Sequence, residues 1–240
     1  MQISTRMAAV GAVLMLAATL PAQAEMLDDA MFTSVRLDQL EYRVGDGSNI
    51  TAWDAEAWIG GDYWKLALES EGEYVTRSKT FETLENQLVV RRLVSDFFDA
   101  KAGIRVDTPA GPDRVYGVIG FQGLAPQWLE VEGDLFLSQK GDLSSRFSAE
   151  YDILLTNRLI LQPVVEINMA ATDDREIGQG QGINDVEAGL RLSYDLVDRT
   201  NAPYVGVHWE RKFGETARLA RDEGEDTDAV RAVAGVRLLF

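Results

Sequence analysis

Apolar and polar residues alternate one by one along most of this 240-residue chain, in stretches of about ten residues. In residues 52–60, for example, the odd positions 53–59 are apolar, whereas Asp54 and Glu56 stand between them. Successive side chains of a strand point to opposite faces, so this period predicts β-strands with one apolar and one polar face. No apolar run is long enough to cross a bilayer as a helix. The pattern therefore predicts an all-β fold.

Residues 1–24 have the organisation of a secretory signal peptide. Arg6 precedes an apolar stretch from Met7 to Leu20, and Ala22-Gln23-Ala24 forms an A-x-A cleavage site. The apolar stretch is short for the alternative, an uncleaved membrane anchor. We therefore expect cleavage after Ala24 and export of residues 25–240. The sequence contains no Cys, which excludes disulfides and thiolate metal sites.

An exported chain with this pattern can span a membrane only as a closed β-barrel, because lipid offers no partner to open backbone N–H and C=O groups. We expect residues 25–34 to form a short periplasmic arm. Residues 35–240 are expected to form one antiparallel, up-and-down transmembrane β-barrel, surrounded by the lipid of the bacterial cell outer membrane. A soluble β-sandwich or a lipocalin-like barrel shares the alternation. The signal, the terminal Phe240 and the unequal connections favour the transmembrane form, with the charged face inside.

The alternation predicts twelve strands, at residues 35–42, 52–60, 63–71, 82–95, 97–107, 115–124, 128–138, 144–154, 159–170, 183–194, 204–211 and 229–240. Ten strands is the alternative, because the first strand and residues 72–95 alternate weakly. Short connections are expected near 61–62, 96, 125–127, 155–158 and 195–203, and longer ones near 43–51, 72–81, 108–114, 139–143, 171–182 and 212–228. Pro163 cannot donate to a strand ladder, so we expect a bulge there or a strand that starts after it.

Aromatic residues gather near the short connections, at Trp58, Tyr63, Trp64, Phe97, Phe98, Trp128, Tyr194, Tyr204 and Phe240. Amphipathic rings favour the bilayer interface, so this placement predicts an aromatic girdle at the periplasmic rim. Ordinary strand propensity is the alternative explanation.

The chain carries 23 basic and 39 acidic residues, a formal net charge of −16. This charge excludes nucleic-acid binding, because it would repel phosphates. With the charged face inside, the expected lumen acids are Asp54, Glu56, Glu69, Asp99, Glu130, Glu132, Asp134, Glu150, Asp152, Glu166, Asp185, Glu187 and Glu210. The expected lumen bases are Lys65, Lys101, Arg105, Arg146, Arg191 and Arg237. Two interpretations stay open: ion pairs that rigidify the barrel, or an acidic surface for metal cations.

His208 is the only histidine and stands two residues before Glu210, on the same face of its predicted strand. A histidine beside a carboxylate can bind copper or act as a base, and a hydrogen-bonded structural histidine is the alternative. Met26 and Met31 carry thioethers, which suit Cu(I). A serine hydrolase would need His208 as its imidazole, and no serine stands in a recognisable nucleophile motif, so we expect no enzymatic activity.

Long stretches of the chain resemble the copper resistance protein B family of outer-membrane barrels. They are DAEAWIGGDYWKLALESEGE at 54–73, QGLAPQWLEVEGDLFLS at 122–138, YDILLTNRLILQPVVEINMAATDD at 151–174 with IGQGQGINDVEAGLRLSYDL at 177–196, and APYVGVHWERKFGETARLAR at 202–221 with the closing AGVRLLF. The resemblance implies copper tolerance at the outer membrane, with copper ion as a weakly or transiently bound ligand. It also implies a periplasmic copper oxidase or carrier as a partner.

Members of that family often carry a Met- and His-rich N-terminal extension that binds copper, whereas after the expected cleavage only Met26 and Met31, and no His, precede this barrel. We therefore expect the barrel itself to bind copper ions or pass them along an acidic lumen. The candidate metal-contacting residues are Asp54, Glu56, Glu130, Glu132, Glu166, Glu187, His208 and Glu210, with Met26 and Met31 of the arm. The alternative is a structural or general diffusion barrel without metal selectivity.

Overall fold

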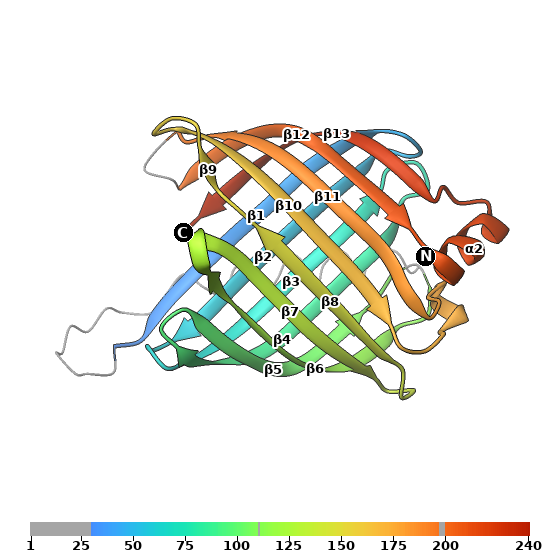
Figure 1. Ribbon diagram of the computed structural model, residues 1–240, viewed down its shortest axis with the longest axis horizontal. Helices are drawn as coiled ribbons and strands as arrows, with labels where there is room; N and C mark the ends of the chain where they lie inside the picture. The colour runs from blue at the N-terminus through green and yellow to red at the C-terminus, as the bar shows by residue number, and fades with distance from the viewer. Residues whose placement is uncertain (1–29, 110, 197–199) are drawn as a thin grey trace, which may run out of the picture. The chain divides into compact units, whose positions relative to one another are not determined.

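The computed structural model describes residues 30–109, 111–196 and 200–240. The expected signal peptide and Met26 lie outside the described residues. Within them, the strands form one antiparallel sheet that closes on itself as a twelve-stranded barrel (Figure 1). This confirms the expected all-β, up-and-down transmembrane barrel, and the ten-strand alternative is wrong.

The strands are β1 (Phe32–Gly45), β2 (Ile50–Gly60), β3 (Trp64–Val75), β4 (Thr80–Ser95), β5 (Phe98–Asp107), β6 (Arg114–Ala125), β7 (Leu129–Ser138), β8 (Leu143–Glu150), β9 (Ile153–Leu154), β10 (Leu159–Ala170), β11 (Gly182–Tyr194), β12 (Asn201–Lys212) and β13 (Asp228–Leu239). The short β9 lies beyond β8 along the same edge of β10, so the two together count as one strand of the barrel. β1 begins inside the expected periplasmic arm.

The barrel closes between β1 and β13, which pair antiparallel. Val35 N donates to Phe240 O at 3.1 Å, and Phe240 N donates to Val35 O at 2.9 Å. The last residue therefore completes the ladder and leaves neither terminal strand with an open edge.

The two ends of the barrel carry different connections. The end where β1 begins and β13 finishes has the turns 61–63, 96–97, 126–128 and 155–158 and the connection from β11 to β12, with the 3-10 helix η1 (Pro126–Trp128) in one of the turns (Figure 1). Short turns are typical of the periplasmic side, so we call this the periplasmic end and the other the outer end. The outer connections are 46–49, 76–79, 108–113, 139–142, 171–181 and 213–227. Those expected at 43–51 and 72–81 are shorter than predicted, because the flanking strands extend further.

The two longest outer connections contain helices. The 3-10 helix η2 (Arg175–Ile177) lies in residues 171–181, and α2 (Gly214–Glu223) lies in residues 213–227. The alternation marks residues 212–228 only as a long polar loop and does not predict α2. The helix ends at Gly224, whose φ of 81° is in the left-handed region that favours glycine. No helix of the described residues is long and apolar enough to span a membrane.

β10 runs through Pro163 without a bulge, so both expected outcomes are wrong. The register of β10 with β8 and with β9 is the same on either side of the proline. The break falls instead on residues 151–152 opposite, which belong to no strand. Tyr151 N donates to Pro163 O at 3.2 Å. Because proline has no N–H to donate, the neighbouring strand loses its regular pairing there.

Most charged side chains point into the barrel and most large apolar ones point out, as predicted, although Tyr116 and Phe136 are buried in the lumen. Buried charged residues include Glu41, Arg43, Glu56, Glu85, Arg91, Lys101, Arg105, Asp134 and Arg191. By contrast, Leu66, Ile104, Ile119, Leu135 and Leu190 are exposed by 46–60%. Such a belt of apolar side chains suits hydrocarbon, and the polar interior suits the lumen of an outer-membrane barrel.

Aromatic residues are exposed at the predicted girdle, but two of the predicted residues point into the barrel instead. Trp64, Phe97 and Phe240 are exposed near the periplasmic end. Tyr204 is instead buried, and its hydroxyl lies 3.0 Å from Glu41 in the lumen. Trp58 shares the inward face of β2 with Glu56, because alternate residues of a strand point the same way.

Candidate functional site

One ionic cluster crosses the inward faces of β2, β3, β4, β5 and β7 toward the periplasmic end. Arg91 of β4 donates to both Glu56 of β2 and Glu69 of β3. Lys101 of β5 has a fully buried side chain, lies 3.5 Å from Glu69 and also pairs with Glu132 of β7. Two of the predicted metal-contacting residues, Glu56 and Glu132, are therefore ion-paired to cations of the barrel.

A second cluster centres on Arg146 of β8. Its guanidinium lies 2.8 Å from Glu71 of β3, 3.0 Å from Glu85 of β4 and 3.1 Å from Glu166 of β10. Arg105 of β5 also pairs with Glu85. We call Arg146 with Glu71, Glu85 and Glu166 the Arg146 cluster. It joins strands from widely separated parts of the barrel wall.

A third cluster surrounds Glu41 of β1, whose side chain is fully buried. Arg43 lies 2.6 Å and Arg191 3.0 Å from its carboxylate, and Tyr204 donates to it at 3.0 Å. A buried carboxylate with this many donors is well satisfied. This cluster therefore ties β1, β11 and β12 together.

His208 of β12 is buried beside the third cluster. Its Nε2 lies 3.3 Å from Arg43 Nη1 and 3.5 Å from Glu187 Oε2. A guanidinium can only donate, so the Nε2 atom that faces Arg43 accepts and the ring proton is assigned to Nδ1. A metal ion could use Nε2 only if Arg43 moved away.

A cavity of about 1040 Å³ occupies the outer end of the barrel. Among the described residues, its wall contains fourteen carboxylates: Glu71, Glu73, Glu82, Glu85, Asp107, Glu166, Glu176, Asp185, Glu187, Glu210, Glu223, Glu225, Asp226 and Asp228. Only six basic residues share the wall: Arg77, Arg105, Arg114, Arg146, Lys212 and Arg231. An excess of one charge in a recess raises the local concentration of the opposite ion, so this cavity should attract cations.

Residues 171–181 and α2 contribute to the wall of this cavity at its outer end, and we call them the roof. Arg114 of β6 holds the first segment, because its guanidinium lies 2.8 Å from Asp174 and 2.9 Å from Glu176. Gly180 N donates to Thr216 of α2 at 3.0 Å, which joins the two segments. The hydrogen bonds from Arg114 hold the pKa of Asp174 below its usual range.

The predicted metal-contacting residues divide into separate groups. Glu166, Glu187 and Glu210 lie in the cavity wall, and Glu210 pairs with Arg231 at 3.1 Å. Glu56 and Glu132 belong to the first cluster, whereas Asp54 and Glu130 lie on strands of the same region and outside the cavity wall. Met31 is 67% exposed just before β1. In the described part of the chain, no three His, Cys, Asp or Glu residues form a group that could hold a metal ion.

Several central lumen residues are absent from the predicted set. They are Glu41, Arg43, Glu71, Glu73, Glu85, Arg91, Asp107 and Arg231. The sequence does contain a signal for these residues, because inward-facing side chains recur at every second position of a strand. It was obscured because polar residues such as Ser70, Asn86 and Arg92 also occupy outward positions of β3 and β4.

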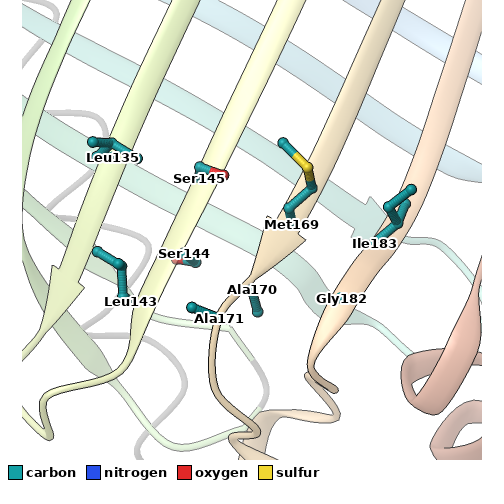
Figure 2. A pocket seen from close by; sticks show the side chains of 9 residues that line it. All are labelled: Leu135, Leu143, Ser144, Ser145, Met169, Ala170, Ala171, Gly182 and Ile183. Carbon is teal, nitrogen blue, oxygen red and sulfur yellow. The ribbon is translucent and has the colours of Figure 1, made fainter.

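A smaller hollow of about 340 Å³ lies around the outer ends of β7, β8, β10 and β11 (Figure 2). Small residues at 144–145, 170–171 and 182 leave a depression between Leu135, Leu143, Met169 and Ile183. Its described wall contains no charged side chain, so it offers nothing to a cation.

Comparison with known proteins agrees with the predicted resemblance. A family model described as Copper resistance protein B precursor matches residues 31–240. This chain belongs to the copper resistance protein B family. Copper resistance protein B of Escherichia coli is 42% identical over 213 residues, which are 89% of this chain and 71% of the relative. A homolog from Pseudomonas syringae pv. tomato is 41% identical over the same shares.

Solved structures support the fold of this copper resistance protein B family member. A NanC porin superposes with a TM-score of 0.52 at 14% identity, over 86% of this chain and 99% of that chain. A KdgM porin in complex with disordered oligogalacturonate gives a TM-score of 0.51 at 13% identity, over the same shares. At such low identity the likeness shows a shared barrel architecture alone. Together with the family, it places the protein in the bacterial outer membrane.

Proposed function

We propose that this protein takes up copper ions in the acidic cavity at its outer end and binds or passes them along the charged lumen, without catalysis. The observation that carries the proposal is the excess of fourteen carboxylates over six basic residues in the described cavity wall. The choice of copper as the metal in this proposal comes from the membership of the copper resistance protein B family. Carboxylate oxygens and one imidazole favour weak, exchangeable binding over a tight site, because carboxylates do not select copper over other divalent cations and Cu(I) prefers thiolate and thioether ligands.

Glu187 is the carboxylate best placed to contact a passing ion. It lies in the cavity wall, and no Arg or Lys of the described residues forms an ion pair with it; the unprotonated Nε2 of His208 lies 3.5 Å from its Oε2. The expected metal contacts at Asp54, Glu56, Glu130, Glu132, Glu166, His208, Glu210, Met26 and Met31 remain part of this proposal. Hand-over to a periplasmic copper oxidase or carrier is likewise proposed from the family resemblance.

The test is copper binding and flux by the refolded protein in liposomes, with matched copper and zinc gradients. Copper flux above both the zinc rate and the empty-vesicle rate supports the proposal. Absence of both binding and flux would move the copper role to a partner protein.

The second candidate function is a structural or general diffusion barrel. The ion-paired clusters favour it, because a lumen whose charges satisfy one another has few groups left for a ligand. Equal behaviour of copper, zinc and other small cations in the same liposomes would support this alternative.

A further inference from the structure

Arg146 lies in the wall of the acidic cavity and reaches across the lumen. Its strand, β8, is separated from β3 by β4, β5, β6 and β7 on one side of the barrel and by six strands on the other. Its guanidinium nevertheless lies 2.8 Å from Glu71 of β3. The pair therefore spans the lumen between nearly opposite parts of the wall.

The geometry of the Arg146 cluster is held by further contacts. Asn168 accepts a hydrogen bond from Arg146 Nε at 3.1 Å, and its own amide donates to Glu166 at 2.9 Å. The Arg146 side chain is 17% exposed, and that of Glu85 is 8% exposed. A guanidinium with three carboxylate partners in a narrow lumen is positioned as a fixed bridge.

We propose that Arg146 is the residue that controls passage from the acidic cavity into the rest of the lumen. Its bridge to Glu71 obstructs the lumen, and its positive charge repels the cations that the cavity collects. The inference deepens the proposed function and rests on ions entering the cavity. Its test uses potassium and chloride instead of copper, so the role of Arg146 and the proposed copper function can be refuted independently of each other.

The test is the conductance of the refolded protein in planar bilayers with KCl. Two variants separate obstruction from charge. Arg146→Gln removes both the bridge and the positive charge, whereas Glu71→Gln breaks the far end of the bridge and keeps Arg146. We expect both variants to conduct several-fold more than the wild type. Preference for potassium over chloride should rise in Arg146→Gln and fall in Glu71→Gln, because the two changes alter the lumen charge in opposite directions.

Arg158→Gln is the matched control, because it removes the same charge from an exposed residue of the connection 155–158. It should conduct like the wild type. Far-UV circular dichroism and protease resistance identify any variant that has not folded. If Arg146→Gln does not fold, the single variants Arg146→Lys and Glu71→Gln test the obstruction instead. Lysine keeps the positive charge but cannot hold three carboxylates in one plane, so Arg146→Lys should also conduct more than the wild type. Wild-type conductance in the folded variants, or selectivity that shifts the same way in both, would overturn the proposal.

Discussion

Each buried cation in the lumen stabilises the barrel only while its carboxylate partners remain. Arg91 is 3% exposed and donates to Glu56 and Glu69. Removing one member of such a group leaves the others charged and unpaired in a narrow interior, which costs more than the pair itself contributes. Individual charged residues of the lumen, such as Arg91, therefore stabilise the folded barrel.

Arg91→Gln should lower the free energy of unfolding by about 3–5 kcal/mol, because two carboxylates lose their partner. The neighbouring Arg92 is exposed on the outward face, where its guanidinium lies 5.2 Å from the Trp64 ring. Arg92→Gln carries the same charge change and should cost about 1 kcal/mol or less. Denaturant titration of both variants in detergent or lipid measures the difference. Equal losses would contradict a structural role specific to the lumen.

Glu187→Gln should weaken copper binding several-fold while leaving the barrel folded, because Glu187 pairs with no guanidinium among the described residues. Isothermal titration or a copper indicator in liposomes gives the affinity. Asp62→Asn, in an exposed turn at the periplasmic end, is the control with the same charge change and should bind like the wild type. Unchanged affinity in Glu187→Gln would remove this residue from the proposed route.

At the scale of elements, Arg114 is the buried cation that holds residues 171–181 over the cavity. Arg114 belongs to β6, and Asp174 lies in a loop that follows β10, so the contact joins elements that the strand order keeps apart. The pKa of Asp174 is lowered, which means that its stabilisation is present above the usual value of 3.8 and is lost as pH falls through the lower folded value. The roof should therefore stay attached at neutral and mildly acidic pH.

Asp174→Asn should release this segment at neutral pH, at a local cost of about 1.5–3 kcal/mol for the charged hydrogen bonds. The native loop should release only below pH 3.8. A spin label at an introduced Arg175→Cys reports loop mobility, since the chain has no other cysteine. Asp113→Asn, in an exposed residue beside Arg114, is the control and should leave mobility unchanged. A loop that stays immobile in Asp174→Asn would show that other contacts hold it.

At the scale of the whole molecule, closure depends on the register between the first and last strands. Leu37 lies opposite Leu238 across β1 and β13. Paired residues of antiparallel strands lie within the Cα separation that a disulfide bridges, about 4.4–6.8 Å.

Leu37→Cys with Leu238→Cys should therefore form a disulfide in the folded barrel. Leu37→Cys with Ala234→Cys is displaced by four residues, roughly 13 Å along the strand, and should not. Gel mobility with and without reductant measures the bond. Cross-linking of the displaced pair in place of the matched one would refute the observed closure.

The sequence by itself determined the all-β class, the inward charged face and a barrel of twelve or ten strands, and the closed ladder of the structure decided for twelve. These follow from local facts, because a period of two fixes which side chains share a face and lipid requires a closed ladder. Tertiary structure alone decided which charges meet. Arg146 and Glu71 are 75 residues apart, and only closure with this strand order brings them together. It also decided that Glu56 and Glu132 are ion-paired while Glu187 faces the acidic cavity, because alternation assigns a face to a side chain but neither its depth in the barrel nor its partner.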